Sequence, residues 1–182
     1  MTEELEVLTI VTGRLAAAGI PYMVTGAVAA SYYAVPRMTR DIDLVVELSA
    51  GDVDRVCGLF EGDFYVNRDV VSAAIGERGR FNLIHHAYVI KVDCIVRRDG
   101  EYRSTEFGRR RHATVEAHDL AFVAPEDLII SKLDWMRQTR PEVQLGDVRD
   151  LLRSVPDLDR SYLAHWIERL GLGARYREAL GE

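Results

Sequence analysis

Cysteine is scarce in this 182-residue chain, which contains only Cys57 and Cys94. The two residues lie in separate apolar stretches and lack the C-x-x-C spacing of redox and zinc sites. We therefore expect two buried thiols in a reducing compartment, and a disulfide between them is the less favoured alternative.

Long apolar runs and excess positive charge are also missing. No stretch approaches the roughly 20 apolar residues of a membrane-spanning helix, and no secretory signal is recognisable, so we expect a cytoplasmic protein with no membrane partner. Lysine and arginine number 23 against 29 aspartates and glutamates, which gives a net charge of −6. This balance argues against a general, non-specific nucleic-acid binder and leaves a local basic patch open.

What the chain does contain is an apolar fraction of 48%, which is ordinary for a globular protein of this length. The most informative stretch spans residues 22–47. It predicts a short apolar strand over 22–24, a break at Gly26, a helix over 27–33 and a second strand that begins Asp41-Ile42-Asp43. On a strand, alternate side chains share a face, so Asp41 and Asp43 should point the same way.

Two like charges on one face of an apolar strand are costly, because they repel and partial burial raises their pKa values. A divalent cation such as Mg²⁺ would offset the repulsion. The alternative is a strand end whose aspartates are solvated or hydrogen-bonded to the backbone, and the Asp-x-Asp pattern alone does not decide between them.

The remaining periodicity predicts alternating helices and strands. Helices are expected over 2–18, 50–60, 69–75, 125–138, 147–153, 159–170 and 174–180, and strands over 64–66, 81–86 and 88–96. Residues 97–112 read as a basic loop, and 141–146 as a connection.

Several polar residues in these segments have two interpretations. The arginines of 97–112 either grip phosphates or form a solvated hairpin, and the solvated interpretation is slightly favoured. Lys132 lies on the apolar side of its helix, where it either extends to solvent or reaches the aspartate cluster or a nucleotide phosphate. Asp147 and Asp150 share a helical face and are interpreted as a solvated or capping pair.

The order of strand, Gly26, helix and Asp-x-Asp strand resembles the nucleotidyltransferase superfamily of the polymerase-β-like fold. Arg37-x-Thr39-x-Asp41-Ile42-Asp43 is most similar to the branch of AbiEii-type abortive-infection toxins, and a weaker likeness extends over 125–133 and 147–151. The chain departs from the family pattern at its glycine pair, where Thr25 or Ala27 stands in place of one member.

The resemblance implies an α/β fold, with a small mixed β-sheet flanked by helices. It implies a nucleotidyltransferase core over residues 1–124 and a helical C-terminal section over 125–182, packed as one unit with the core. The implied catalytic and metal-binding residues are Asp41, Asp43 and Asp93. The implied nucleotide-binding residues are Gly26, Ala27, Arg37, Arg40 and Lys132.

The resemblance further implies Mg²⁺ or Mn²⁺ as cofactor and a nucleoside triphosphate as substrate. A nucleoside monophosphate would pass to an RNA, protein or small-molecule acceptor, and the protein would be a toxin with a cognate antitoxin. The competing hypothesis is a catalytically weak binding protein or antitoxin on the same fold, which Ala27 favours because it lacks the hydroxyl of a serine.

Overall fold

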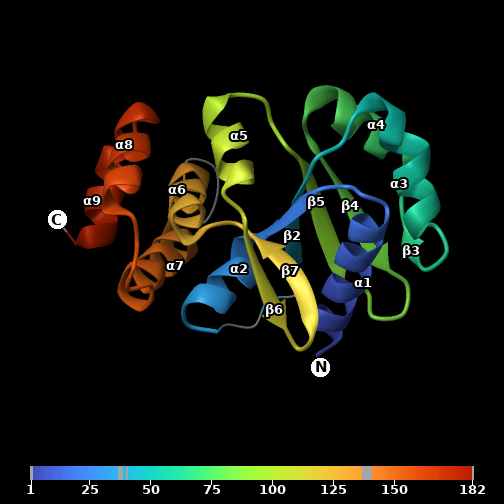
Figure 1. Ribbon diagram of the computed structural model, residues 1–182, viewed down its shortest axis with the longest axis horizontal. Helices are drawn as coiled ribbons and strands as arrows, with labels where there is room; N and C mark the ends of the chain where they lie inside the picture. The colour runs from blue at the N-terminus through green and yellow to red at the C-terminus, as the bar shows by residue number, and fades with distance from the viewer. Residues whose placement is uncertain (1, 37–38, 40, 137–140, 182) are drawn as a thin grey trace.

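The computed structural model describes residues 2–36, 39, 41–136 and 141–181. Their strands form one mixed sheet in the order β3-β4-β5-β2-β1-β7-β6, with helices packed around it (Figure 1). The strands are β1 (Tyr22–Thr25), β2 (Asp41–Val46), β3 (Phe64–Tyr65), β4 (Arg80–His85), β5 (Lys91–Val96), β6 (Arg111–Val115) and β7 (His118–Phe122). The predicted α/β class with a mixed sheet is confirmed.

The helices lie largely where the periodicity predicts them. They are α1 (Glu3–Ala17), α2 (Gly26–Tyr33), α3 (Val53–Phe60), α4 (Arg68–Glu77), α5 (Glu101–Gly108), α6 (Pro125–Trp135), α7 (Pro141–Ser154), α8 (Arg160–Arg169) and α9 (Gly173–Leu180). Helices α7, α8 and α9 gather at one end of the molecule, away from α3 and α4 (Figure 1). No helix in the described ranges is long and apolar enough to cross a membrane.

The register of the central strands decides which side chains meet. Strand β2 pairs antiparallel with β1 and parallel with β5, and β4 pairs antiparallel with β5. Along β2, Ile42, Leu44 and Val46 are buried on one face, while Asp41 and Asp43 lie on the other. The alternation expected for this strand is therefore confirmed, and its polar face is the one that carries the aspartates.

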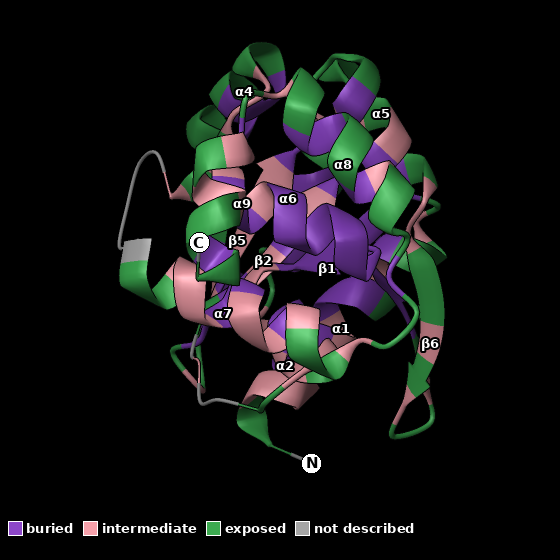
Figure 2. Ribbon diagram, turned by 90° about the vertical axis from the view of Figure 1, so that its left-hand side faces the viewer, coloured by how far each residue is buried: buried purple, intermediate pink, exposed green. Residues whose placement is uncertain are grey.

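Helix α6 lies in the middle of the molecule and contacts α2, α7 and α8 (Figure 2). Pro125 occupies its first turn, where the missing N–H costs nothing. Leu128, Ile129, Ile130 and Leu133 are fully buried, so the helix is surrounded by protein. Its polar residues therefore have to be matched by partners on neighbouring elements.

Two segments differ from the sequence-based expectation. Residues 97–112 are not a loop, because α5 forms within them and buries Tyr102 and Phe107 against the core. Residues 141–146 are not a connection, because α7 begins at Pro141 and runs through them. In both cases too few apolar residues lie at helical spacing for the pattern to stand out.

The β6–β7 hairpin had no counterpart among the expected elements. Its two-residue turn, Glu116-Ala117, has positive φ at both positions (44° and 69°). Turns of this kind usually carry Asn, Asp or Gly, which tolerate that conformation. Because the turn contains none of these three residue types, the usual sequence signal for a hairpin is missing.

Candidate active site

Gly26 makes the turn between β1 and α2, with φ at +64°. A Cβ atom built on it would lie 2.0 Å from Oδ2 and 2.7 Å from Cγ of Asp43. Glycine is therefore required here both by the left-handed backbone and by the carboxylate that packs against its Cα. The turn and the Asp-x-Asp strand, separate in the sequence, form one structural unit.

The three predicted aspartates lie on the same face of two neighbouring strands. Asp43 on β2 is paired directly with Asp93 on the parallel strand β5, and Asp41 is paired with Lys91. The side chain of Asp93 is 16% exposed, whereas that of Asp41 is 64% exposed. The register thus places Asp43 and Asp93 side by side, with Asp41 about 7 Å further along β2.

The electrostatics of this cluster are unfavourable for Asp43. Burial raises the pKa of its carboxyl, and the neighbouring charge of Asp93 raises it further. Lys91 compensates in part: its Nζ lies 3.0 Å from Asp93 Oδ2 and 3.7 Å from Asp41 Oδ1. The side-chain nitrogen of Asn82, in the amide orientation that satisfies its neighbours, donates to Asp93 Oδ1 at 2.5 Å.

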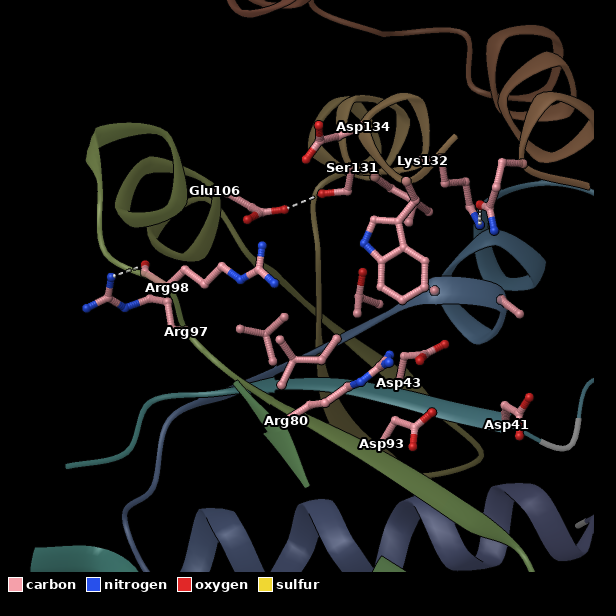
Figure 3. Close-up of a pocket in the computed structure, with 18 of the residues that line it drawn as sticks. Asp41, Asp43, Arg80, Asp93, Arg97, Arg98, Glu106, Ser131, Lys132 and Asp134 are labelled. Carbon is pink, nitrogen blue, oxygen red and sulfur yellow. Dashed lines mark hydrogen bonds between the residues drawn. The ribbon is translucent and has the colours of Figure 1, made fainter. Parts of the chain in front are cut away.

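These aspartates form the floor of a cleft of about 580 Å³. The opposite wall comes from α5 and α6, which present Glu106, Ser131 and Lys132 (Figure 3). Arg103 and Trp135, from the same two helices, also line the cleft. A volume of this size lies within the range of small-molecule and cofactor pockets. Trp135 is 39% exposed, which is unusual for so large an apolar side chain, and it faces the same cleft as the carboxylates.

Lys132 is 4% exposed and lines the cleft. Its Nζ lies 2.7 Å from Asp147 Oδ2 and 3.4 Å from Gln144 Oε1, and its charge lowers the pKa of Asp43 against the larger raising effects. The lysine therefore pairs with Asp147, a partner that the sequence did not indicate, and does not extend to solvent. The interpretation of Asp147 as a solvated residue is wrong, because it is 8% exposed and paired with Lys132.

Of the four other predicted nucleotide-binding residues, the structure describes two. Gly26 and Ala27 line the cleft beside Asp43. Arg37 and Arg40 lie outside the described residues.

The arginines of the basic segment have mostly intramolecular partners. Arg97 pairs with Glu47, and Arg103 pairs with Glu106 and Asp134. Further along, Arg109 binds the fully buried carboxylates of Glu126 and Asp127, and Arg111 also reaches Glu126. Arg110 donates to the carbonyl of Phe107 and lies over its ring.

Those contacts decide against one of the two interpretations of the segment and leave phosphate binding a prediction. A solvated hairpin is wrong, because Arg109 and Arg111 hold α6 through its two buried acids. Arg98 differs from the other five: it lines the cleft and makes no ion pair with any residue that the structure describes.

The similarity of this chain to known proteins is found in its structure and not in its sequence. By sequence, the chain matches no protein-family profile and no curated protein. Its structure is similar to that of an antigenic nucleotidyltransferase-like protein from Paracoccidioides brasiliensis, with a TM-score of 0.55 and 18% identity over 99% of this chain and 93% of that one. This chain has the nucleotidyltransferase fold.

Two further structures share that fold. The lincosamide antibiotic adenylyltransferase LnuA, with lincomycin bound, has a TM-score of 0.54 and 12% identity over 84% of this chain and 97% of its own. The antibiotic-resistance factor ANT(2'')-Ia has a TM-score of 0.54 and 14% identity over 96% of this chain and 91% of its own. At these identities the likeness concerns the fold of the chain.

The chemistry of the three aspartates fits a hard divalent cation, because Asp41, Asp43 and Asp93 supply carboxylate oxygens on one face of the sheet. As the side chains stand, no three Asp, Glu, His or Cys residues in the described ranges are close enough to share a metal ion. Lys91 contacts two of the three aspartates. The metal-binding role of the aspartates stays a prediction.

Three residues of the cleft were missed by sequence reasoning: Lys91, Arg80 and Trp135. Lys91 lies two positions before Asp93, so the same alternation that pairs Asp41 with Asp43 places it on the aspartate face. Trp135 lies three positions after Lys132, on the same side of α6. Arg80 gave no signal, because only the pairing of β4 with β5 brings it to the cleft.

Proposed function

We propose that the protein is a nucleotidyltransferase that moves a nucleoside monophosphate from a nucleoside triphosphate to an acceptor hydroxyl. The observation that supports this most directly is the register of β2 and β5. It sets Asp43 beside Asp93, while Gly26 packs against Asp43, in a cleft that also contains Lys132. The fold shared with a lincosamide antibiotic adenylyltransferase supports the same reaction class.

In this reaction the acceptor oxygen bonds to the α-phosphorus, and the bond from that phosphorus to the bridging oxygen breaks. Pyrophosphate leaves with the bonding electrons, and Asp93 takes the hydroxyl proton. The bare Cα of Gly26 and the amide of Ala27, at the start of α2, give phosphate oxygens close access to the backbone. The ammonium of Lys132, which is held by Asp147, lines the opposite wall.

Asp41, Asp43 and Asp93 are the residues that would hold Mg²⁺ or Mn²⁺. Bound there, divalent ions supply charge neutralisation for the triphosphate and for the leaving pyrophosphate. Lys91 pairs with Asp93 and Asp41, so its ammonium would have to leave these carboxylates for them to hold the ion.

The acceptor class and the biological role are also part of this proposal. The likeness of residues 37–44 to AbiEii-type toxins favours a toxin with a cognate antitoxin, and an RNA, protein or small-molecule acceptor. A catalytically weak binding protein or antitoxin is the second candidate, because Ala27 provides no hydroxyl beside the phosphates. A gene for an antitoxin next to this one would favour the toxin.

The reaction class is tested with nucleoside triphosphates labelled at the α- or the γ-phosphate. Each is incubated with the protein, Mg²⁺ and total RNA, cell protein or a metabolite extract. Transfer of the α-label without the γ-label is expected, and Asp43→Asn and Asp93→Asn should each lower it by at least about 100-fold. Arg153→Gln, on the exposed face of α7, is the matched control. Transfer of the γ-label, or equal activity in the aspartate variants, would refute the proposal.

Binding is measured separately from transfer. The chain has two tryptophans, of which Trp135 faces the cleft and Trp166 is 6% exposed in the core. In a Trp166→Phe variant, the fluorescence of Trp135 should change on addition of a nucleoside triphosphate. A protein that binds in this way and transfers no label would support the second candidate.

A further inference from the structure

We propose that one end of the cleft binds an anionic, phosphate-bearing group of the acceptor through Arg80 and Arg98. This end is formed by β4 and by the residues that follow β5. The inference rests on the proposed function and adds the chemical class of the acceptor. It is carried by the ion pairs at this end of the cleft and by the order of the strands.

Four arginines line this end, and two of them are neutralised. Arg97 pairs with Glu47, and Figure 3 shows its side chain directed out of the cleft. Arg103 is shared between Glu106 and Asp134. Glu47, Glu106 and Asp134 are therefore already paired with arginines.

Arg80 and Arg98 remain. Both are exposed, both line the cleft, and neither makes an ion pair with a residue of the described ranges. Figure 3 shows both side chains extended into the cleft. Two unneutralised guanidinium groups on one wall attract an anion and repel a cation, and their forked N–H groups match the oxygens of phosphate.

The strand order assigns this anion to the acceptor. Gly26 follows β1, on one flank of β2, whereas β5 and then β4 lie on the other flank. A triphosphate over the Gly26 turn therefore occupies the β1 side of Asp43. The acceptor approaches from the β5 side, where Asp93 lies.

Arg80 lies beside Asp93 on the face of the sheet that the acceptor would meet. Asn82 is paired with Asp93, and Arg80 is two residues away on the same face of β4, paired with Ile95. That is about 7 Å along the strand, roughly the distance from an attacking hydroxyl to the phosphate of the same nucleotide or phosphorylated sugar.

The test is thermal unfolding in inorganic phosphate, compared with chloride at equal ionic strength. Saturating α,β-methylene-ATP, which cannot transfer its nucleotide, fills the triphosphate site together with Mg²⁺. The parent protein should be stabilised by phosphate in a concentration-dependent manner. Arg80→Gln and Arg98→Gln should each weaken the apparent phosphate affinity by about tenfold, and Arg153→Gln should leave it unchanged.

A second measurement separates the acceptor from the triphosphate. Calorimetric affinity for α,β-methylene-ATP should be the same in the parent and in both arginine variants. A tenfold loss would place the triphosphate at these arginines and overturn the assignment to the acceptor. Equal stabilisation of the parent and the variants by phosphate would refute the anion site.

The outcome is distinguishable from failure of the proposed function. If phosphate binding depends on Arg80 and Arg98 while no α-label is transferred to any acceptor, the anion site stands and catalysis does not. If label is transferred but phosphate has no effect, nucleotidyl transfer stands and the phosphate-bearing acceptor is refuted.

Discussion

Replacing Gly26 by alanine separates two effects that the structure combines at one residue. The left-handed backbone, with φ at +64°, costs a residue with a Cβ about 1 kcal/mol. The new Cβ would also lie 2.0 Å from Asp43 Oδ2, so the carboxylate must move by at least about 1.4 Å to reach an ordinary contact distance. Displacement of this half-buried side chain adds about 1 to 3 kcal/mol. We therefore expect Gly26→Ala to lower the free energy of unfolding by about 2 to 4 kcal/mol in total.

Gly171 provides the matched control. Its φ is +66°, and a Cβ there meets nothing within 4 Å, so Gly171→Ala should show the backbone cost of about 1 kcal/mol alone. Urea unfolding of the two variants and the parent gives both values. The difference between them measures the contact with Asp43.

A double variant tests the assignment of that difference. Combining Gly26→Ala with Asp43→Gly removes the clashing side chain, so the two changes should cost about 1 to 3 kcal/mol less than their sum. Equal destabilisation by Gly26→Ala and Gly171→Ala, or additive costs in the double variant, would refute the close packing of Gly26 on Asp43.

Three further predictions concern the charges of the cleft. In chelator, Asp43→Asn should melt higher than the parent by roughly 2 to 4 °C at pH 7.5, because burial and Asp93 raise the pKa of Asp43 and the ionised form destabilises the fold. This gap should close as the pH falls toward the raised pKa, and a neutral or lower melting temperature would contradict it. Lys91→Met should lower the free energy of unfolding in chelator by up to about 1 kcal/mol. It should also increase the stabilisation by Mn²⁺, measured by thermal melts with and without the ion, and an unchanged response to Mn²⁺ would contradict this. Arg109→Gln should lower the free energy of unfolding by about 3 kcal/mol, since it removes a partner from two buried carboxylates. Arg98→Gln should change the free energy of unfolding by no more than about 0.5 kcal/mol. Similar urea midpoints for the two variants would contradict this difference.

The local pattern of the sequence determined the central unit of the fold. Alternation along 41–46 predicted that Asp41 and Asp43 share a face, and the β-branched run around Asp93 predicted a second acidic strand. Both signals depend only on neighbours along the chain, since a strand places alternate side chains on opposite faces wherever it lies. The turn at Gly26 was likewise predicted from local sequence, because a glycine lies there between a strand pattern and a helix pattern.

Long-range pairing decided the rest, because it depends on which strands and helices become neighbours. The register of β2 with β5 places Lys91 against Asp41 and Asp93, and the packing of α6 on α7 buries Lys132 with Asp147. The arginines of residues 97–111 looked alike in sequence. Tertiary structure separated them, because burying an acid requires a cation beside it. Arg109 met buried carboxylates on α6, whereas Arg98 met none and was left facing the cleft.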